Sequence, residues 1–281
     1  MRNSMLLHVF SIVIALLAAA PPGRAADAGC GEVVTITTHD NTTTRYAYAG
    51  PQSGTAALVL LPGGGGFLDL DSAGCPRALK GNSLVKSLPH FHALGFATAL
   101  VDAPSDHASD EGLGGFRTVA AHAQDIGKVI EDMRRRTGAP VWLVGTSRGT
   151  ISAVNVASRL TGPAAPDGLI LTSALMEGQV GARLTWVSQS VFNLELEAIR
   201  QPTLLIGHVD DTCARSPPSV MPRVIARING VREQMVAVTG GPGKIPASGI
   251  SACEGRAPHG YIEQEAEVAA GMARFIRGGM Y

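Results

Sequence analysis

Short apolar runs alternate with amphipathic segments along most of this chain, and this alternation restricts the fold more than any other feature. Several of the runs are followed directly by glycine, proline or aspartate. Runs of this length that end at turn residues are typical of strands buried on both faces of a parallel sheet. The expected strands are residues 32–38, 56–61, 96–101, 141–144, 169–172, 203–206 and 234–238.

Three segments between these runs have helical patterns: residues 118–136, 150–160 and 263–276. In the first of them apolar residues recur at helical spacing, and Gly138 and Pro140 follow its end. Strands that alternate with helices form βαβ units. The chain is therefore expected to belong to the α/β class, with a mostly parallel central sheet and helices on both faces.

The first 28 residues have the layout of a secretory signal peptide. Arg2 precedes an apolar run over residues 5–20, and residues 21–23 are helix breakers. Cleavage is expected after Ala25, or as late as Ala28, which would place the protein outside the cytoplasm, secreted or periplasmic. An uncleaved anchor is disfavoured because the run is short for a membrane span.

Residues 26–281 are expected to form one domain, which a chain of 281 residues can accommodate. Residues 176–199 are longer than an ordinary connection. They either cover the active site as a small cap or form an ordinary pair of surface helices. Lysine plus arginine balance aspartate plus glutamate at 23 each, so the basic surface of a nucleic-acid-binding protein is not expected.

The four cysteines, Cys30, Cys75, Cys213 and Cys253, all lie in the expected mature chain. In an oxidising compartment an even number favours disulfides, and four cysteines allow three connectivities. The chain has no CxxC pair, so neither a zinc site nor thioredoxin-like chemistry is indicated. No metal and no cofactor is expected.

Ser147 lies in the only GxSxG motif of the chain, residues 145–149. The motif directly follows the expected strand 141–144 and precedes a helical segment. A sharp strand-to-helix turn of this kind needs small residues beside the serine and exposes its hydroxyl at the carboxyl end of the sheet. This context predicts that Ser147 is a nucleophile.

A serine nucleophile needs a base and an acid, which in such folds follow it in the order acid, then histidine. Of the eight histidines, only His259 lies after the candidate acids, in a loop between the last expected strand and the final helix. Asp210 and Asp211 both follow the strand 203–206. Counting from Gly207 favours Asp210, whereas counting from the strand itself favours Asp211, which we prefer.

The oxyanion of a tetrahedral intermediate needs backbone donors. One is expected from Arg148, and the others from Gly64 and Gly65 in the glycine-rich turn after the strand 56–61, where glycine lets the backbone N–H groups approach substrate. No Lys-Ser or Lys-Thr follows these glycines, which excludes a P-loop. Four further polar residues, Asp102, Ser105, Asp106 and His107, follow the next strand. They either contact substrate at the same sheet edge or stabilise their own loop.

Several segments together resemble the α/β-hydrolase superfamily, and within it an exported branch. They cover most of the mature chain and are residues 61–66 (LPGGGG), 81–85 (GNSLV), 101–107 (VDAPSDH), 145–150 (GTSRGT), 211–213 (DTC), Cys253 and 258–260 (PHG). One departure is Gly207-His208, where the branch is expected to have His-His.

The resemblance implies a triad of Ser147, Asp211 and His259 and a disulfide between Cys213 and Cys253. Cys30 and Cys75 would then form the remaining pair. It implies no cofactor and does not identify the substrate. We expect a hydrolase of small carboxylic esters that works through an acyl-enzyme. The alternatives are an amidase or peptidase of the same fold, and a secreted binding protein that no longer turns over.

Overall fold

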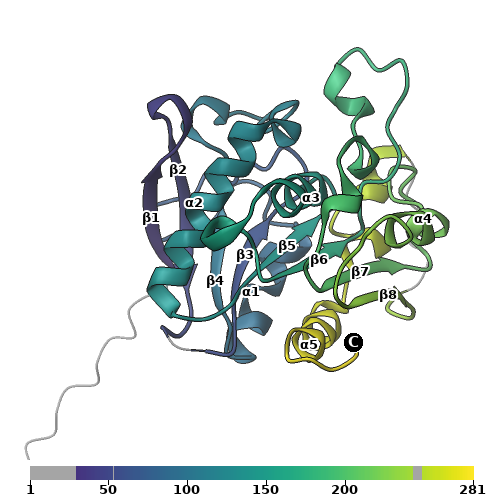
Figure 1. Ribbon diagram of the computed structural model, residues 1–281. Helices are drawn as coiled ribbons and strands as arrows, with labels where there is room; N and C mark the ends of the chain where they lie inside the picture. Colours follow the sequence, from purple (N-terminus) through teal and green to yellow (C-terminus); the bar gives the residue numbers. More distant parts are fainter. Residues whose placement is uncertain (1–29, 53, 243–248) are drawn as a thin grey trace, which may run out of the picture.

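The computed structural model describes residues 30–52, 54–242 and 249–281, and an eight-stranded sheet runs through this part of the chain (Figure 1). The expected signal peptide lies outside the described residues. The strand order is β1-β2-β4-β3-β5-β6-β7-β8. The strands are β1 (Glu32–Thr37), β2 (Thr43–Ala49), β3 (Ala57–Leu61), β4 (Ala97–Val101), β5 (Val141–Thr146), β6 (Gly168–Thr172), β7 (Thr203–His208) and β8 (Glu233–Val238).

Six strands, from β3 to β8, are parallel, whereas β2 pairs antiparallel with both β1 and β4. The helices lie on both faces of the sheet (Figure 1). Their bounds are α1 (Ser83–Ala93), α2 (Ala120–Thr137), α3 (Gly149–Arg159), α4 (Met221–Ile225) and α5 (Glu265–Ile276). The predicted fold class is confirmed.

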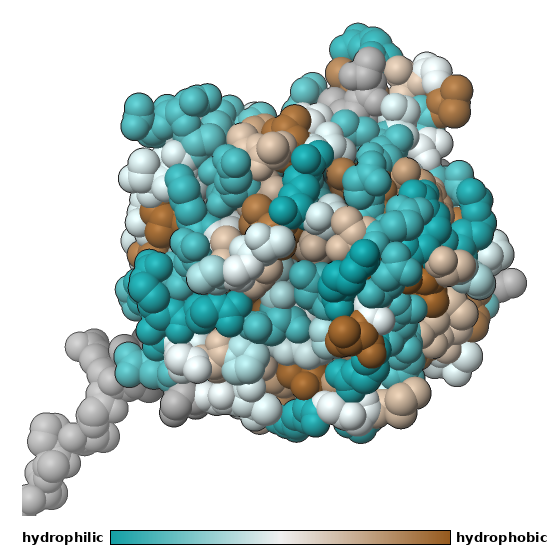
Figure 2. Space-filling view, in the orientation of Figure 1, coloured by the Kyte–Doolittle hydropathy of each residue, from teal (hydrophilic) through white to brown (hydrophobic). Residues whose placement is uncertain are grey.

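The core consists of two apolar layers, one on each face of the sheet. Successive residues of a strand point to opposite faces, so Leu143 of β5 packs toward α2 and α3, and Trp142 packs toward α1 and α5. Every residue of β3, β4, β5, β6 and β7 is buried. This two-sided burial explains why these strands are continuous apolar runs. The face of the molecule shown in Figure 2 is accordingly mostly hydrophilic, with small hydrophobic areas.

Residues 176–199 contain three short 3-10 helices rather than a pair of α-helices: Thr185–Ser188, Val191–Asn193 and Leu196–Ala198. The segment after β6 projects from the body of the molecule (Figure 1). None of the described helices has both the length and the apolar character needed to cross a membrane. Because β3 to β8 are parallel, their carboxyl ends meet at one edge, which is where ligand sites of such sheets form.

Candidate active site

Ser147 lies at the turn between β5 and α3. Its φ angle of 52° is in the left-handed region, which is uncommon for a residue with a side chain and typical of a strained functional turn. The Ser147 N–H donates to the Thr172 carbonyl of β6 at 3.0 Å. The turn requires glycine on both sides. A Cβ at Gly149 would lie 2.0 Å from the Leu61 carbonyl oxygen, and one at Gly145 would lie 2.6 Å from the Gly149 oxygen.

Asp211 and His259 come from the loop after β7 and from a 3-10 turn, Pro258–Gly260. His259 Nδ1 and Asp211 Oδ2 are 2.8 Å apart, and both side chains are buried. The other carboxylate oxygen, Oδ1, accepts the Cys213 N–H at 2.8 Å. Because the carboxylate can only accept, this pairing assigns the proton to Nδ1 and leaves a lone pair on Nε2.

His259 Nε2 is buried and has no hydrogen-bond partner among the described residues. His259 and Ser147 line the same small cavity, of about 40 Å³, together with Gly63 and Asn82. A buried nitrogen lone pair at a cavity that a serine also lines has the chemistry of a general base, although no hydrogen bond joins Nε2 to Ser147 among the described residues. Asp210, in contrast, is half-buried, and within the described chain its side chain makes no hydrogen bond to His259.

Two residues that we did not single out from the sequence hold the His259 turn on the sheet. The Ser173 hydroxyl, directly after β6, donates to the His259 carbonyl at 2.7 Å. The Tyr261 hydroxyl donates to the Ile206 carbonyl of β7 at 2.9 Å and accepts the Ser173 N–H at 3.0 Å. Burial raises the pKa of Tyr261, so its hydroxyl stays protonated as this donor. The backbone of the base is thus fixed to the ends of two strands.

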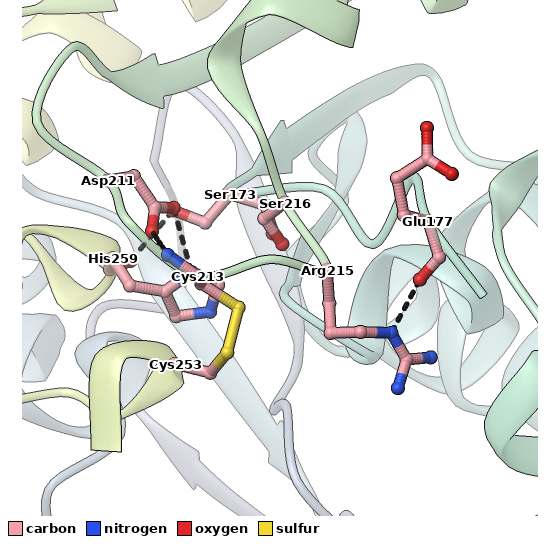
Figure 3. Close-up of a disulfide and its surroundings, with 8 residues drawn as sticks. All are labelled: Ser173, Glu177, Asp211, Cys213, Arg215, Ser216, Cys253 and His259. Atoms are coloured by element: carbon pink, nitrogen blue, oxygen red, sulfur yellow. Dashed lines mark hydrogen bonds and ion pairs between the residues drawn. A yellow bond between two sulfur atoms is a disulfide. The ribbon is translucent and has the colours of Figure 1, made fainter. Parts of the chain in front are cut away.

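The structure contains two disulfides. Cys213 and Cys253 are bridged, with a Cα–Cα distance of 4.7 Å, and the bridge lies beside His259 and Asp211 (Figure 3). Cys30 and Cys75 are bridged with a Cα–Cα distance of 4.8 Å. Asp211, Cys213 and His259 are close enough together to suggest a metal site. However, the sulfur of Cys213 is oxidised, so it offers no thiolate ligand.

A larger cavity, of about 380 Å³, opens beside Ser147 and is lined by Gly64, Gly65 and Arg148. The turn is closely packed, because a Cβ at Gly63 would lie 2.9 Å from the Ser147 Cβ. In the described parts of the chain no hydrogen bond uses the N–H of Gly64 or Gly65. The three predicted oxyanion residues therefore lie together at the cavity that also contains the serine.

Arg117 contacts the buried side of this glycine turn, and the sequence analysis did not identify this residue. Its buried guanidinium donates to the carbonyls of Pro62 and Gly64, at 3.2 and 3.3 Å, and to the Ser152 hydroxyl of α3 at 2.7 Å. Burial, with a smaller effect of the nearby Arg148 charge, lowers the pKa of Arg117. One side chain thus links the glycine turn to the helix that follows Ser147.

Residues 102–107, which could either contact substrate or stabilise their loop, have structural contacts. Asp102 accepts the N–H groups of Leu68 and Leu70, at 2.6 and 3.1 Å, just after the glycine turn. Burial raises the pKa of Asp102, and these backbone N–H groups oppose that effect. In the described chain Asp102, Ser105, Asp106 and His107 line neither cavity that contains Ser147.

The larger cavity also has a charged wall. Arg215 lines it together with Arg148, and burial and the charge of Arg215 lower the pKa of Arg148 to about 10. Arg215 donates to the backbone carbonyls of Glu177 and Val187, of which the Glu177 contact is visible in Figure 3. Residues 176–199 are thereby attached to the rim of the cavity.

Comparisons with known proteins agree with this architecture. An esterase, RhEst1 from Rhodococcus, has a TM-score of 0.57 and 16% identity over 88% of this chain and 99% of its own. XC6422 from Xanthomonas campestris is described as an α/β serine hydrolase without a lid. Its TM-score is 0.52 and its sequence identity 14%, over 87% of this chain and 93% of its own. A proline iminopeptidase from Mycobacterium smegmatis has a TM-score of 0.58 and a sequence identity of 12%, over 88% of this chain and 98% of its own.

No protein-family model matches the chain. A comparison with curated protein sequences gives no match either. At identities of 12–16% the structural likeness establishes the fold, and the chain has the α/β-hydrolase fold.

Proposed function

We propose that this protein hydrolyses small carboxylic esters through an acyl-enzyme on Ser147. The observation that supports this most strongly is the buried pair of His259 and Asp211. Its Nδ1–Oδ2 bond of 2.8 Å leaves an unpartnered Nε2 in a cavity shared with Ser147. Serine needs such a base because its hydroxyl is a weak nucleophile at neutral pH.

In the proposed reaction, the Ser147 oxygen attacks the ester carbonyl carbon while His259 Nε2 accepts the hydroxyl proton. The negative charge on the former carbonyl oxygen is stabilised by the backbone N–H of Arg148 and by those of Gly64 and Gly65. When the C–O bond to the alcohol breaks, His259 returns its proton to the leaving oxygen. Water then attacks the acyl-enzyme by the same route, and His259 again acts as the base.

Asp211 serves this cycle by orienting the imidazole and stabilising its protonated form. Two disulfides and the sequence of the first 28 residues support export, so we propose that the mature enzyme begins after Ala25 or Ala28 and works in an oxidising compartment.

The test is hydrolysis of p-nitrophenyl esters of graded acyl length by the parent and by Ser147→Ala. Loss of the nucleophile should lower kcat by several orders of magnitude, on the order of 10⁴-fold or more. Ser158→Ala, in α3 and outside both cavities, is the matched control and should keep full activity.

Three results would contradict the proposal in distinguishable ways. Equal rates for Ser147→Ala and the parent would exclude Ser147 as nucleophile. Cleavage of aminoacyl p-nitroanilides at higher kcat/KM than any ester would favour the peptidase alternative. A parent that turns over neither class would favour a binding protein on a hydrolase scaffold.

A further inference from the structure

A cluster of histidine and aspartate side chains lies away from the candidate active site, between the β1–β2 connection and the loop after β4. His39 belongs to the 3-10 turn His39–Asn41, and Asp106 and His107 to the turn Ser105–His107. His39 Nε2 is 3.0 Å from Asp106 Oδ2, and His107 Nε2 is 3.7 Å from the same oxygen. The three atoms all lie within 4.8 Å of one another.

The other nitrogen of each imidazole already has a partner. His39 Nδ1 is 2.6 Å from Asp125 Oδ2, and Asp125 Oδ1 accepts the His39 backbone N–H at 2.9 Å. His107 Nδ1 is 3.1 Å from the Gly112 carbonyl oxygen. The Gly112 carbonyl oxygen can only accept, so the proton of the neutral His107 ring is on Nδ1 and its lone pair is on Nε2. His39 has a carboxylate oxygen beside each ring nitrogen, so its Nε2 donates to Asp106 when the ring is protonated and offers a lone pair there when the ring is neutral.

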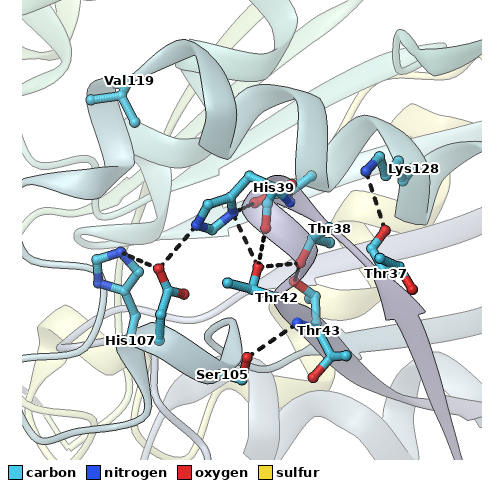
Figure 4. Close-up of polar contacts among 12 residues, drawn as sticks. Thr37, Thr38, His39, Thr42, Thr43, Ser105, His107, Val119 and Lys128 are labelled. Carbon is cyan, nitrogen blue, oxygen red and sulfur yellow. Dashed lines mark hydrogen bonds and ion pairs between the residues drawn. The ribbon is translucent and has the colours of Figure 1, made fainter.

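The two Nε2 atoms face the same region as a carboxylate oxygen of Asp106 (Figure 4 shows the two rings). A metal ion bound here would take the place of the proton between His39 Nε2 and Asp106 Oδ2, and it would give the lone pair of His107 Nε2 a partner. The rings are also fixed in place, because Phe116 stacks on His107 at 4.4 Å and contacts His39 at 4.7 Å between ring centroids. The cluster has the donor set and the preset orientation of a metal site.

We propose that His39, Asp106 and His107 bind one divalent transition-metal ion, with Zn²⁺ as the representative ligand. Bonds of about 2.0–2.2 Å in a tetrahedral site place ligand atoms about 3.3 Å apart. The separations of the two Nε2 atoms from Asp106 Oδ2 are 3.0 and 3.7 Å, on either side of that value, and the two Nε2 atoms lie within 4.8 Å of each other. Rotation of the partly exposed His107 and Asp106 side chains can therefore complete the site. Two imidazoles and one carboxylate suit zinc rather than calcium or magnesium, which prefer oxygen ligands.

Access and a fourth ligand are both available. The Asp106 side chain is 42% exposed, and that of His107 is 25% exposed, so an ion can reach the site and keep a water molecule. Asp125 would not bind the metal itself but would orient the His39 ring through its bond to Nδ1, a common arrangement at metal-binding histidines. The structural consequence is a link from the β1–β2 connection to the loop that packs on the glycine turn, where the Leu113 N–H donates to the Gly65 carbonyl at 2.8 Å.

The experiment is a calorimetric titration of ZnCl₂ into mature, tag-free protein that has been treated with chelator and dialysed at neutral pH. The parent should bind one ion per chain and show a higher Tm as the zinc concentration increases. Asp106→Asn and His107→Gln should bind at least 10-fold more weakly. His90→Gln, in α1 on the opposite face of the sheet, should bind like the parent.

Cobalt provides a second readout that does not depend on activity. The Co²⁺-loaded parent should show the visible absorption of a four-coordinate site, and both ligand variants should lose it. Circular dichroism checks that the variants are folded, which their surface positions favour. The proposal is overturned if the parent binds no zinc stoichiometrically, or if Asp106→Asn and His107→Gln bind as tightly as the parent.

Discussion

Removal of the Cys213–Cys253 disulfide should lower both the stability and the activity of the protein, and the two effects can be separated. The bridge closes a loop between residues 40 positions apart. In the chain-entropy model a loop of this length contributes about 4 kcal/mol to the free energy of unfolding. The double variant Cys213→Ala, Cys253→Ala should therefore be less stable by about that amount, measured by urea unfolding with linear extrapolation.

The effect on activity follows from where the two cysteines lie. The Cys213 N–H donates to Asp211 Oδ1, and Cys253 lines the small cavity with His259. Without the bridge the acid loop and the base loop are tied only by weaker contacts. Misplacement of a catalytic group by about 1 Å can cost about 100-fold in rate. We expect kcat for a p-nitrophenyl ester to fall at least tenfold, with a smaller change in KM.

The second disulfide supplies a matched control. Cys30 and Cys75 are 45 positions apart, so the same model predicts nearly the same loss of stability. Within the described chain neither lines a cavity that contains Ser147, so Cys30→Ala, Cys75→Ala should keep the parent's kcat. Assays belong at a temperature where all three proteins are fully folded. Equal kcat for the two double variants would refute the positioning role, and unchanged stability would refute the loop-closure reasoning.

Three further predictions concern single side chains. Asp211→Asn should lower kcat by about 10³–10⁴-fold, while Asp210→Asn keeps most of it; the reverse ranking in ester assays would move the acid to Asp210. Arg117→Met should lower kcat about tenfold or more with little change in KM, because the carbonyls of the glycine turn lose their buried donor. Arg117→Lys should have a higher kcat than Arg117→Met. A change in KM without a change in kcat would contradict this prediction. Burial lowers the pKa of His122 to about 3, with a smaller contribution from the charge of Arg117. In the unfolded state His122 therefore takes up a proton at about pH 6.5, whereas in the folded state it stays neutral there. The free energy of unfolding should therefore fall as the pH decreases below 6.5. Measured by urea unfolding, the decrease between pH 7 and pH 5 should be about 2 kcal/mol smaller in His122→Gln than in the parent. Equal decreases in the two proteins would refute the lowered pKa of His122.

The features that could be predicted from the sequence are those encoded locally. The strands of the parallel region are visible because burial on both faces requires continuous apolar runs. The turn at Ser147 is visible because its two glycines lie two residues before and two residues after the serine. The strand β2 was not predicted, since only part of it is buried and its threonines and Arg45 interrupt the apolar pattern. The helix α1 was not predicted either, because Pro89 lies inside it.

The supporting contacts of the site could not be predicted, because they join residues that are far apart in the sequence. Ser173 and Tyr261 are 88 positions apart, yet their hydroxyls are 3.0 Å from each other. Arg117 appears in the sequence as an ordinary charged residue before a helix, and only the fold shows that it is buried behind the glycine turn. The sequence favours Asp211 over Asp210 only by the counting of residues after a strand, because both directly follow β7. The 2.8 Å contact between Asp211 Oδ2 and His259 Nδ1 depends on the fold.

The central claim is that Ser147 is the activated nucleophile of a serine hydrolase. Its most direct test is reaction of the purified mature protein with a fluorophosphonate probe, followed by peptide mapping by mass spectrometry. We expect one stoichiometric adduct, on the peptide that contains Ser147, with labelling lost in Ser147→Ala and strongly slowed in His259→Ala. A stoichiometric adduct on any other residue, or no adduct on the folded parent, would contradict it.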